Sequence, residues 1–132
     1  MDKRIGIFWL RDDFRIKKNL GLYEATNNHD EVIVFYLYKE SIYHDQEAQK
    51  WWLNKSLINY KKQLNNLNIN LEIIKTNSFK LFFDKLITKK NISIYWNKVY
   101  EPEYLKFDET LIASLKKKKI SYKICKGNIL NE

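Results

Sequence analysis

Apolar residues gather in five short runs, separated by longer segments of a different spacing. The runs are rich in β-branched and aromatic residues, which are typical of strands. The first two are apolar at consecutive positions, as expected for strands buried on both faces of a parallel sheet. We therefore predict five strands, at residues 4–10, 31–38, 69–74, 91–96 and 120–125.

The intervening segments repeat apolar residues at steps of three and four, which places those residues on one face of a helix. Four helices are predicted, at 19–27, 46–67, 78–89 and 103–118. The apolar stripes are Leu53, Leu57, Tyr60, Leu64 and Leu67 in the second helix, Phe79, Phe82, Phe83, Leu86 and Ile87 in the third, and Tyr104, Phe107, Leu111 and Leu115 in the fourth. Asn19 and Ser78 are predicted N-caps, and Pro102 marks the start of the last helix.

This alternation of strands and helices contains no run of adjacent hairpins. It predicts an α/β fold, a Rossmann-like doubly wound five-stranded parallel sheet with helices on both faces. The length suits one domain over residues 1–132. Ligands of such sheets bind beyond the carboxyl ends of the strands, where the strand order reverses. The segments after the first, second and fourth strands, "LRDDFR", "YLYKESIYHD" and "NKVYEPEY", are therefore the candidate binding loops.

The formal net charge of +8 only weakly indicates a nucleic-acid partner, because most of the excess is lysine spread over predicted helix faces. The run "KKKK" at 116–119 sits at a helix end, where the helix dipole favours cations. The only cysteine, Cys125, excludes an internal disulfide and is typical of a small apolar strand residue in a reducing compartment. No apolar stretch is long enough to cross a bilayer, and the N-terminus lacks signal-peptide features. We expect a cytoplasmic protein with no membrane partner.

Glycine is missing where nucleotide-binding loops need it. The three glycines are Gly6, Gly21 and Gly127, and none lies in the turn between the first strand and the first helix. A dinucleotide fingerprint or a P-loop needs glycine there so that backbone amides can approach phosphates, which argues against nicotinamide dehydrogenases and P-loop hydrolases. Two histidines and one cysteine do not supply a zinc site, and no catalytic triad order is present.

Several stretches resemble the DNA photolyase/cryptochrome family in order and spacing. They are "FWLRDDFRIKKNLGL", "QKWWLNKSLINYKKQL", "YWNKVYEPEYLKFDETL" and the terminal "KGNILNE". The first resembles the opening of the family, the second its second helix, and the third its segment after the fourth strand. The resemblance extends over essentially the whole chain.

The resemblance implies an N-terminal antenna-binding α/β domain whose larger helical FAD-binding domain is absent from this chain. The antenna pigment would be a folate, a deazaflavin or FMN, and FAD would bind only in the helical domain. The parent protein would be a deoxyribodipyrimidine photo-lyase, a carbon–carbon lyase that uses light and reduced FAD to split cyclobutane pyrimidine dimers. The implied partners are the helical domain and, through the parent protein, damaged DNA. This chain alone is expected to hold no catalytic residue, and its uncovered apolar surface can favour self-association.

The candidate pigment contacts lie at or just after the ends of predicted strands and at the starts of the second and fourth helices. They are Arg11, Tyr36, Tyr38, His44, Lys50, Trp51, Asn97, Glu101 and Tyr104, with no metal ligand among them. Structural alternatives are a salt-bridged loop for Arg11, core packing for the strand tyrosines, and solvation for His44 and Lys50. Asn97 can bond loop backbone through both its donor and its acceptor. A helix turns Trp51 and Trp52 about 100° apart, so that one can face the sheet.

Glu101 is the favoured contact, because a carboxylate accepts hydrogen bonds from the N–H groups of a pterin or flavin ring. Pro102 fixes the chain direction, so Glu101 and Tyr104 are predicted to bracket one cavity. The folate-binding members of the family have an asparagine–glutamate pair where this chain has Glu103 and Tyr104. That departure leaves deazaflavin, flavin or no pigment open.

Two other functions remain open at this point. One is a cryptochrome-type blue-light photosensor, because the residues that separate sensors from repair enzymes lie in the helical domain. The other is a stand-alone nucleotide-binding α/β domain without light chemistry.

Overall fold

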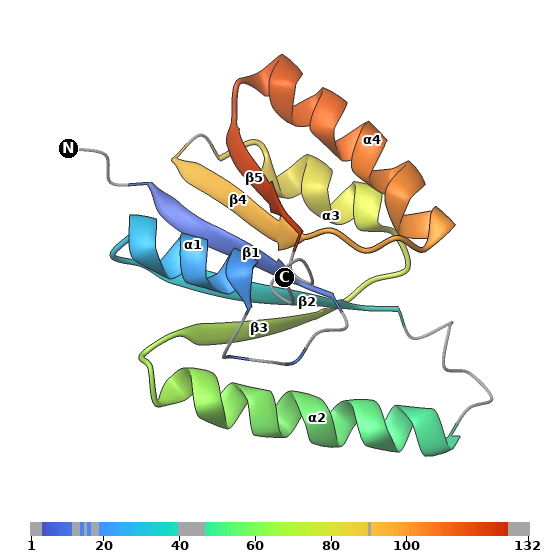
Figure 1. The fold of residues 1–132 in the computed structure, drawn as a ribbon. Helices are drawn as coiled ribbons and strands as arrows, with labels where there is room; N and C mark the ends of the chain where they lie inside the picture. The colour runs from blue at the N-terminus through green and yellow to red at the C-terminus, as the bar shows by residue number, and fades with distance from the viewer. Residues whose placement is uncertain are drawn as a thin grey trace.

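The computed structural model describes residues 4–11, 14, 16, 19–39, 47–89 and 91–126. Strands and helices alternate through this part of the chain (Figure 1). The elements are β1 (Ile5–Leu10), α1 (Leu20–Asn28), β2 (Val32–Tyr38), α2 (Glu47–Asn65), β3 (Asn70–Lys75), α3 (Phe79–Leu86), β4 (Ile92–Asn97), α4 (Pro102–Lys118) and β5 (Ser121–Cys125). Each lies within three residues of its predicted bounds.

All strand pairings are parallel, and the strand order is β3-β2-β1-β4-β5. The chain builds outward from β1 to β3, then returns through α3 and places β4 on the other side of β1. The strand order therefore reverses between β1 and β4. The predicted Rossmann-like parallel sheet is confirmed.

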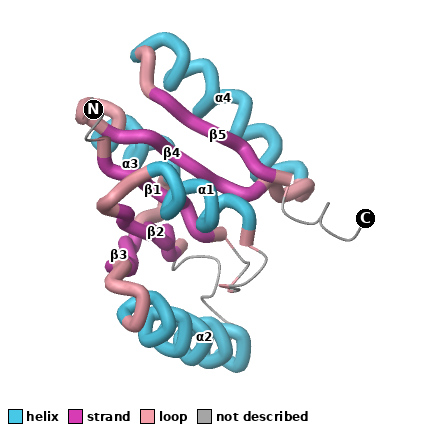
Figure 2. Tube along the Cα trace, turned by 60° about the vertical axis from the view of Figure 1, so that its left-hand side comes forward, coloured by secondary structure: helices cyan, strands magenta, loops and turns pink. Residues whose placement is uncertain are grey.

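Helices cover both faces of the sheet (Figures 1 and 2). Successive side chains of a strand point to opposite faces, so β1 contributes Phe8 and Leu10 to one core and Ile7 and Trp9 to the other. The first core is closed by the apolar stripes of α1 and α2, and the second by those of α3 and α4. The doubly wound arrangement follows from this division.

The predicted caps are present. The Asn19 side chain accepts a hydrogen bond from Leu22 N at 3.1 Å, and Ser78 Oγ accepts one from Leu81 N at 3.2 Å. Pro102 occupies the first turn of α4, where its missing N–H leaves no intrahelical bond unmade. The N-termini of α1, α3 and α4 are thus fixed by residues of the local sequence.

One predicted core residue is wrong. Leu67 is 52% exposed, because α2 ends at Asn65 and the following turn carries Asn68 in the left-handed region at φ 60°. The turn takes Leu67 off the buried stripe, of which the other four members are buried. In the part of the chain that the structure describes, no helix is long and apolar enough to span a membrane.

Candidate functional site at the carboxyl edge of the sheet

Three chain segments meet at the edge where the parallel strands end. Arg11 directly follows β1, Lys39 directly follows β2, and Asn97 is the last residue of β4. The register pairs Leu10 with Tyr36 and Trp9 with Trp96, so these ends lie level with one another. This edge, next to the strand-order reversal, is where ligands of doubly wound sheets bind.

Arg11 lies inside the protein rather than on a free rim. Its side chain is 2% exposed and forms a two-point ion pair with Asp108 of α4, with Nη1 3.2 Å from Oδ2 and Nη2 bonded to Oδ1. Its guanidinium lies 4.1 Å from the ring centre of Trp9 and 4.8 Å from that of Tyr104. The carboxylate and the rings replace water around this cation. Arg11 is therefore salt-bridged, as its structural alternative predicts, but its partner is on α4, and its contact with a pigment stays a prediction.

Asn97 joins β4 to the start of α1. Its Oδ1 accepts a hydrogen bond from Gly21 N at 2.8 Å, and its Nδ2 donates to Asn19 Oδ1 at 2.7 Å. Because Asn19 Oδ1 also caps Leu22 N, one amide network holds the first turn of α1 against the sheet edge. Asn97 thus uses both its donor and its acceptor, as predicted. The partners differ from the predicted loop backbone, because they are a backbone N–H of α1 and the side chain of Asn19.

The strand tyrosines are core residues. Tyr36 and Tyr38 are each 5% exposed and belong to the apolar core beneath α2.

Lys50 and Trp51 lie in the first turns of α2, which begins at the carboxyl edge, and Trp51 is 56% exposed. Trp52 is 64% exposed, so the expectation that one of the two tryptophans faces the sheet is wrong. Both rings lie outside the buried stripe and contact each other, with centroids 5.4 Å apart.

The start of α4 carries the remaining predicted contacts. Glu101 is the exposed N-cap residue and makes no side-chain capping bond, so its carboxylate faces solvent. Tyr104 stacks on Phe79 with ring centroids 6.0 Å apart, which anchors α4 to α3. His44 lies outside the described residues. Its contact with a pigment stays a prediction, as do those of Glu101 and Tyr104.

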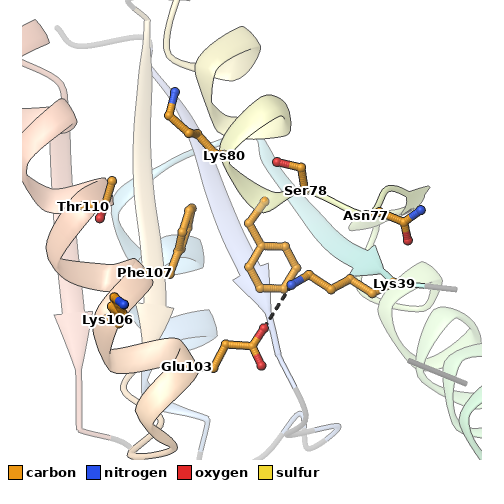
Figure 3. A pocket seen from close by; sticks show the side chains of 9 residues that line it. Lys39, Asn77, Ser78, Lys80, Glu103, Lys106, Phe107 and Thr110 are labelled. Carbon is orange, nitrogen blue, oxygen red and sulfur yellow. Dashed lines mark hydrogen bonds and ion pairs between the residues drawn. The ribbon is translucent and has the colours of Figure 1, made fainter. Parts of the chain in front are cut away.

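A pocket of about 350 Å³ opens between α3 and α4 at this edge (Figure 3). It is lined by Lys39, Asn77, Ser78, Phe79, Lys80, Glu103, Lys106, Phe107 and Thr110. The lining contains neither Glu101 nor Tyr104, so the cavity that these two residues are predicted to bracket stays a prediction. Glu103 carries the acidic group instead, paired with Lys39 Nζ at 3.1 Å.

None of the nine predicted contacts lies in this lining. A signal for this pocket is present in the sequence, because Asn77 and Ser78 follow the predicted third strand and Ser78 is a predicted N-cap. Parallel strands end at one edge, so the segment after the third strand belongs to the candidate site as much as the segments after the other strands. Asn77 and Ser78 are not among the predicted contacts, because that prediction rests on the charged and aromatic segments after β1, β2 and β4.

Among the described residues, no cluster of three or more histidine, cysteine, aspartate or glutamate side chains could hold a metal ion. The free thiol, Cys125, is buried at the end of β5, and burial raises its pKa. A protonated, enclosed thiol is a poor nucleophile. Cations, amides and aromatic rings can bind and orient a ligand here.

The sequence profile of the family described as DNA photolyase matches residues 6–132. The chain belongs to the DNA photolyase family. It is 29% identical over 135 residues to cryptochrome-2 of Arabidopsis thaliana, covering 100% of this chain and 22% of the relative. It is 26% identical over 126 residues to a deoxyribodipyrimidine photo-lyase of Agrobacterium fabrum, covering 96% of this chain and 26% of that protein. The chain thus spans about a quarter of the length of these photolyase and cryptochrome relatives.

The fold agrees with this membership. An archaeal photolyase from Sulfolobus tokodaii, solved with two FAD molecules and described as having a novel light-harvesting cofactor, superposes with a TM-score of 0.78 at 22% identity. The match covers 92% of this chain and 29% of the archaeal photolyase. At this identity the superposition establishes the α/β architecture that this chain shares with a photolyase.

Proposed function

We propose that this chain is the N-terminal antenna-binding α/β domain of a deoxyribodipyrimidine photo-lyase that repairs cyclobutane pyrimidine dimers in light. The observation that carries the proposal is the family match over residues 6–132, together with 26% identity to a photo-lyase along 96% of the chain. The helical FAD-binding half belongs to the rest of the parent protein, because the relatives are about four times as long as the matched segment.

In this proposal the chain binds and orients a pigment and carries out no bond cleavage. FAD in the helical half supplies the light-driven electron that splits the dimer. Of the predicted pigment contacts, Trp51 and Glu101 are exposed at the carboxyl edge, and Lys50, next to Trp51 in the chain, is partly buried. A half-exposed indole can stack on a planar pigment, and a carboxylate can accept hydrogen bonds from ring N–H groups. A lysine can pair with an anionic tail.

These groups fit a planar pigment better than the buried candidates do. Lys55 Nζ lies 4.7 Å from the ring centre of Trp51, so a cation already occupies one part of the indole surface. Arg11 is neutralised by Asp108, and Tyr36 is enclosed in the core. In this proposal the pigment is therefore contacted directly by Trp51, Glu101 and Lys50. The buried residues Arg11 and Tyr36 instead hold the ends of the strands in position.

The test uses the intact gene product loaded with FAD. Oligothymidine that contains cyclobutane dimers is mixed with the protein and illuminated, and restored thymine is measured by chromatography. We expect dimer splitting in light and none in the dark. A folded, FAD-loaded protein that neither splits nor binds the dimer would contradict the proposal.

A second candidate function is a cryptochrome-type photosensor. It is favoured by the 29% identity to cryptochrome-2 over the full chain. The same preparation separates the two functions. A sensor shows light-driven reduction of FAD without affinity for the dimer, whereas a photo-lyase shows both photoreduction and dimer binding.

A further inference from the structure

The pocket between α3 and α4 is lined mainly by cations and neutral hydrogen-bond donors. Lys39, Lys80 and Lys106 reach it from three different elements, and Glu103 is the only acidic residue of the lining. The lining therefore carries two net positive charges. Asn77, Ser78 and Thr110 add an amide and two hydroxyl groups. Such a set can satisfy several oxygens of one anion at once.

The Lys39–Glu103 pair does not cancel this charge. The Lys39 side chain is 18% exposed and its Nζ lies 4.0 Å from the ring centre of Phe79, so this cation is largely removed from water. The Glu103 side chain is 68% exposed, so water screens its carboxylate. A poorly hydrated cation attracts an incoming anion more strongly than a hydrated one.

The other two lysines are available. Lys106 of α4 lines the pocket and has no ion-pair partner among the residues that the structure describes. Lys80 pairs with Asp84 at 2.8 Å, but their side chains are 68% and 47% exposed, which makes this a weak surface contact. Both ammonium groups can turn toward a ligand at little cost.

Ser78, one of the neutral donors, is held in place before a ligand binds. Thr76 Oγ1 accepts from Ser78 N at 3.1 Å and donates to Ser78 O at 3.0 Å, which closes a tight turn after β3. Ser78 Oγ accepts from Leu81 N, so its hydroxyl hydrogen remains free to donate. The aromatic part of the lining is also held in place, because the rings of Phe79 and Phe107 meet edge to face with centroids 5.5 Å apart.

From these features we propose that the α3–α4 pocket binds the phosphate group of a small phosphate monoester. A monoester phosphate carries a charge of about −1.5 to −2 and three acceptor oxygens, which match the two net charges and the several donors of the lining. A single carboxylate would leave one positive charge unmatched. The pocket, at about 350 Å³, falls within the ordinary range for organic ligands and is much larger than a bare phosphate needs. The ester group fills the remaining space along Phe107.

This inference does not depend on the proposed photo-lyase function, since it requires neither light nor a pigment. The test is an NMR titration of the intact protein, which follows the backbone amide signals of Ser78, Lys106 and Thr110. The probes are AMP and ribose 5-phosphate, with adenosine, inorganic phosphate and succinate as comparisons. We expect the two monoesters to shift all three signals and to bind more tightly than each comparison compound.

Two substitutions make the test specific. Lys106→Met should weaken AMP binding by about tenfold, because it removes one charged hydrogen-bond donor. Lys118→Met is the matched control on the same helix, exposed and outside the pocket, and should change affinity less than twofold. Both lysines are exposed, so both variants should keep the melting temperature of the parent.

Three results would overturn the inference. The first is no shift of the pocket signals at millimolar AMP. The second is an equal effect of the Lys106 and Lys118 substitutions, which would indicate nonspecific attraction to a basic surface. The third is binding of succinate or inorganic phosphate as tight as that of the monoesters. Thr110→Val supplies a further check, because it removes a pocket hydroxyl at constant shape and should also weaken AMP binding.

Discussion

Arg11 and Asp108, which are 97 residues apart in the chain, form a buried ion pair that ties the end of β1 to α4. The pair lies beside Trp9 and Tyr104, so the second core closes around it. It holds α4 against the carboxyl edge and thereby sets the position of the α4 side chains that line the pocket.

Replacing Asp108 with alanine should lower the free energy of unfolding by about 3–5 kcal/mol, because Arg11 would keep its charge inside the protein without a partner. Equilibrium unfolding in urea measures the change. The double variant Arg11→Met, Asp108→Leu removes both charges and should recover most of the loss. A loss below about 1 kcal/mol for Asp108→Ala would show that water reaches Arg11 and that the pair is not buried.

Asn97→Ala should destabilise the protein by about 1–3 kcal/mol, because Gly21 N and Asn19 Oδ1 would each lose a partner at the edge of the core. Asn54, an exposed asparagine of α2, gives the matched control, and Asn54→Ala should be nearly neutral. Urea unfolding of both variants provides the comparison. Equal effects at the two positions would contradict a structural role for the Asn97 amide.

The substitution Gly21→Ala has two opposite effects on stability, a gain from helix propensity and a loss from crowding in the core. In an exposed helix this change favours the helix by about 1 kcal/mol. Here a Cβ atom at position 21 would lie 2.7 Å from Phe8 Cε1 and 2.8 Å from Asn97 Oδ1. Crowding of this kind costs about 1–3 kcal/mol, so the net effect should be destabilising. A rise in melting temperature would show that β4 and α1 are less closely packed than described.

The sequence was sufficient for the fold because the relevant signals are local. Apolar spacing located the strands and helices, and capping residues such as Asn19 and Ser78 located helix starts. The prediction for Leu67 is wrong because the apolar spacing continues past Asn65, where α2 ends, into the turn that contains the left-handed Asn68. Periodicity describes the face of a helix and does not fix its last turn.

The candidate site was less accessible to sequence reasoning, because its contacts are long-range. Nothing near Arg11 indicates that its partner is Asp108, since the two meet only after β1 and α4 pack together. Likewise, Lys39, Ser78 and Lys106 line one pocket although each comes from a different segment. Charge and ring content point to the loops after β1, β2 and β4, whereas the pocket also uses Asn77 and Ser78 from the shorter loop after β3.

The single thiol should be slow to react. Burial raises the pKa of Cys125, so the reactive thiolate is scarce at neutral pH. We expect a thiol reagent such as dithionitrobenzoate to label the folded protein far more slowly than the urea-unfolded protein. The release of thionitrobenzoate, followed by absorbance, measures both rates. Labelling at the same rate in the two states would contradict the enclosed position of Cys125 at the end of β5.

We propose that the carboxyl edge of this sheet holds a planar pigment. The most direct test of this proposal is reconstitution of the intact protein with FMN, a deazaflavin and a reduced folate, followed by gel filtration and absorption spectroscopy. One of these pigments should elute with the folded protein in a one-to-one ratio. Trp51→Ala or Glu101→Gln should weaken its retention, whereas Lys118→Met should not. If the folded protein retains none of the three, the edge is not a pigment site.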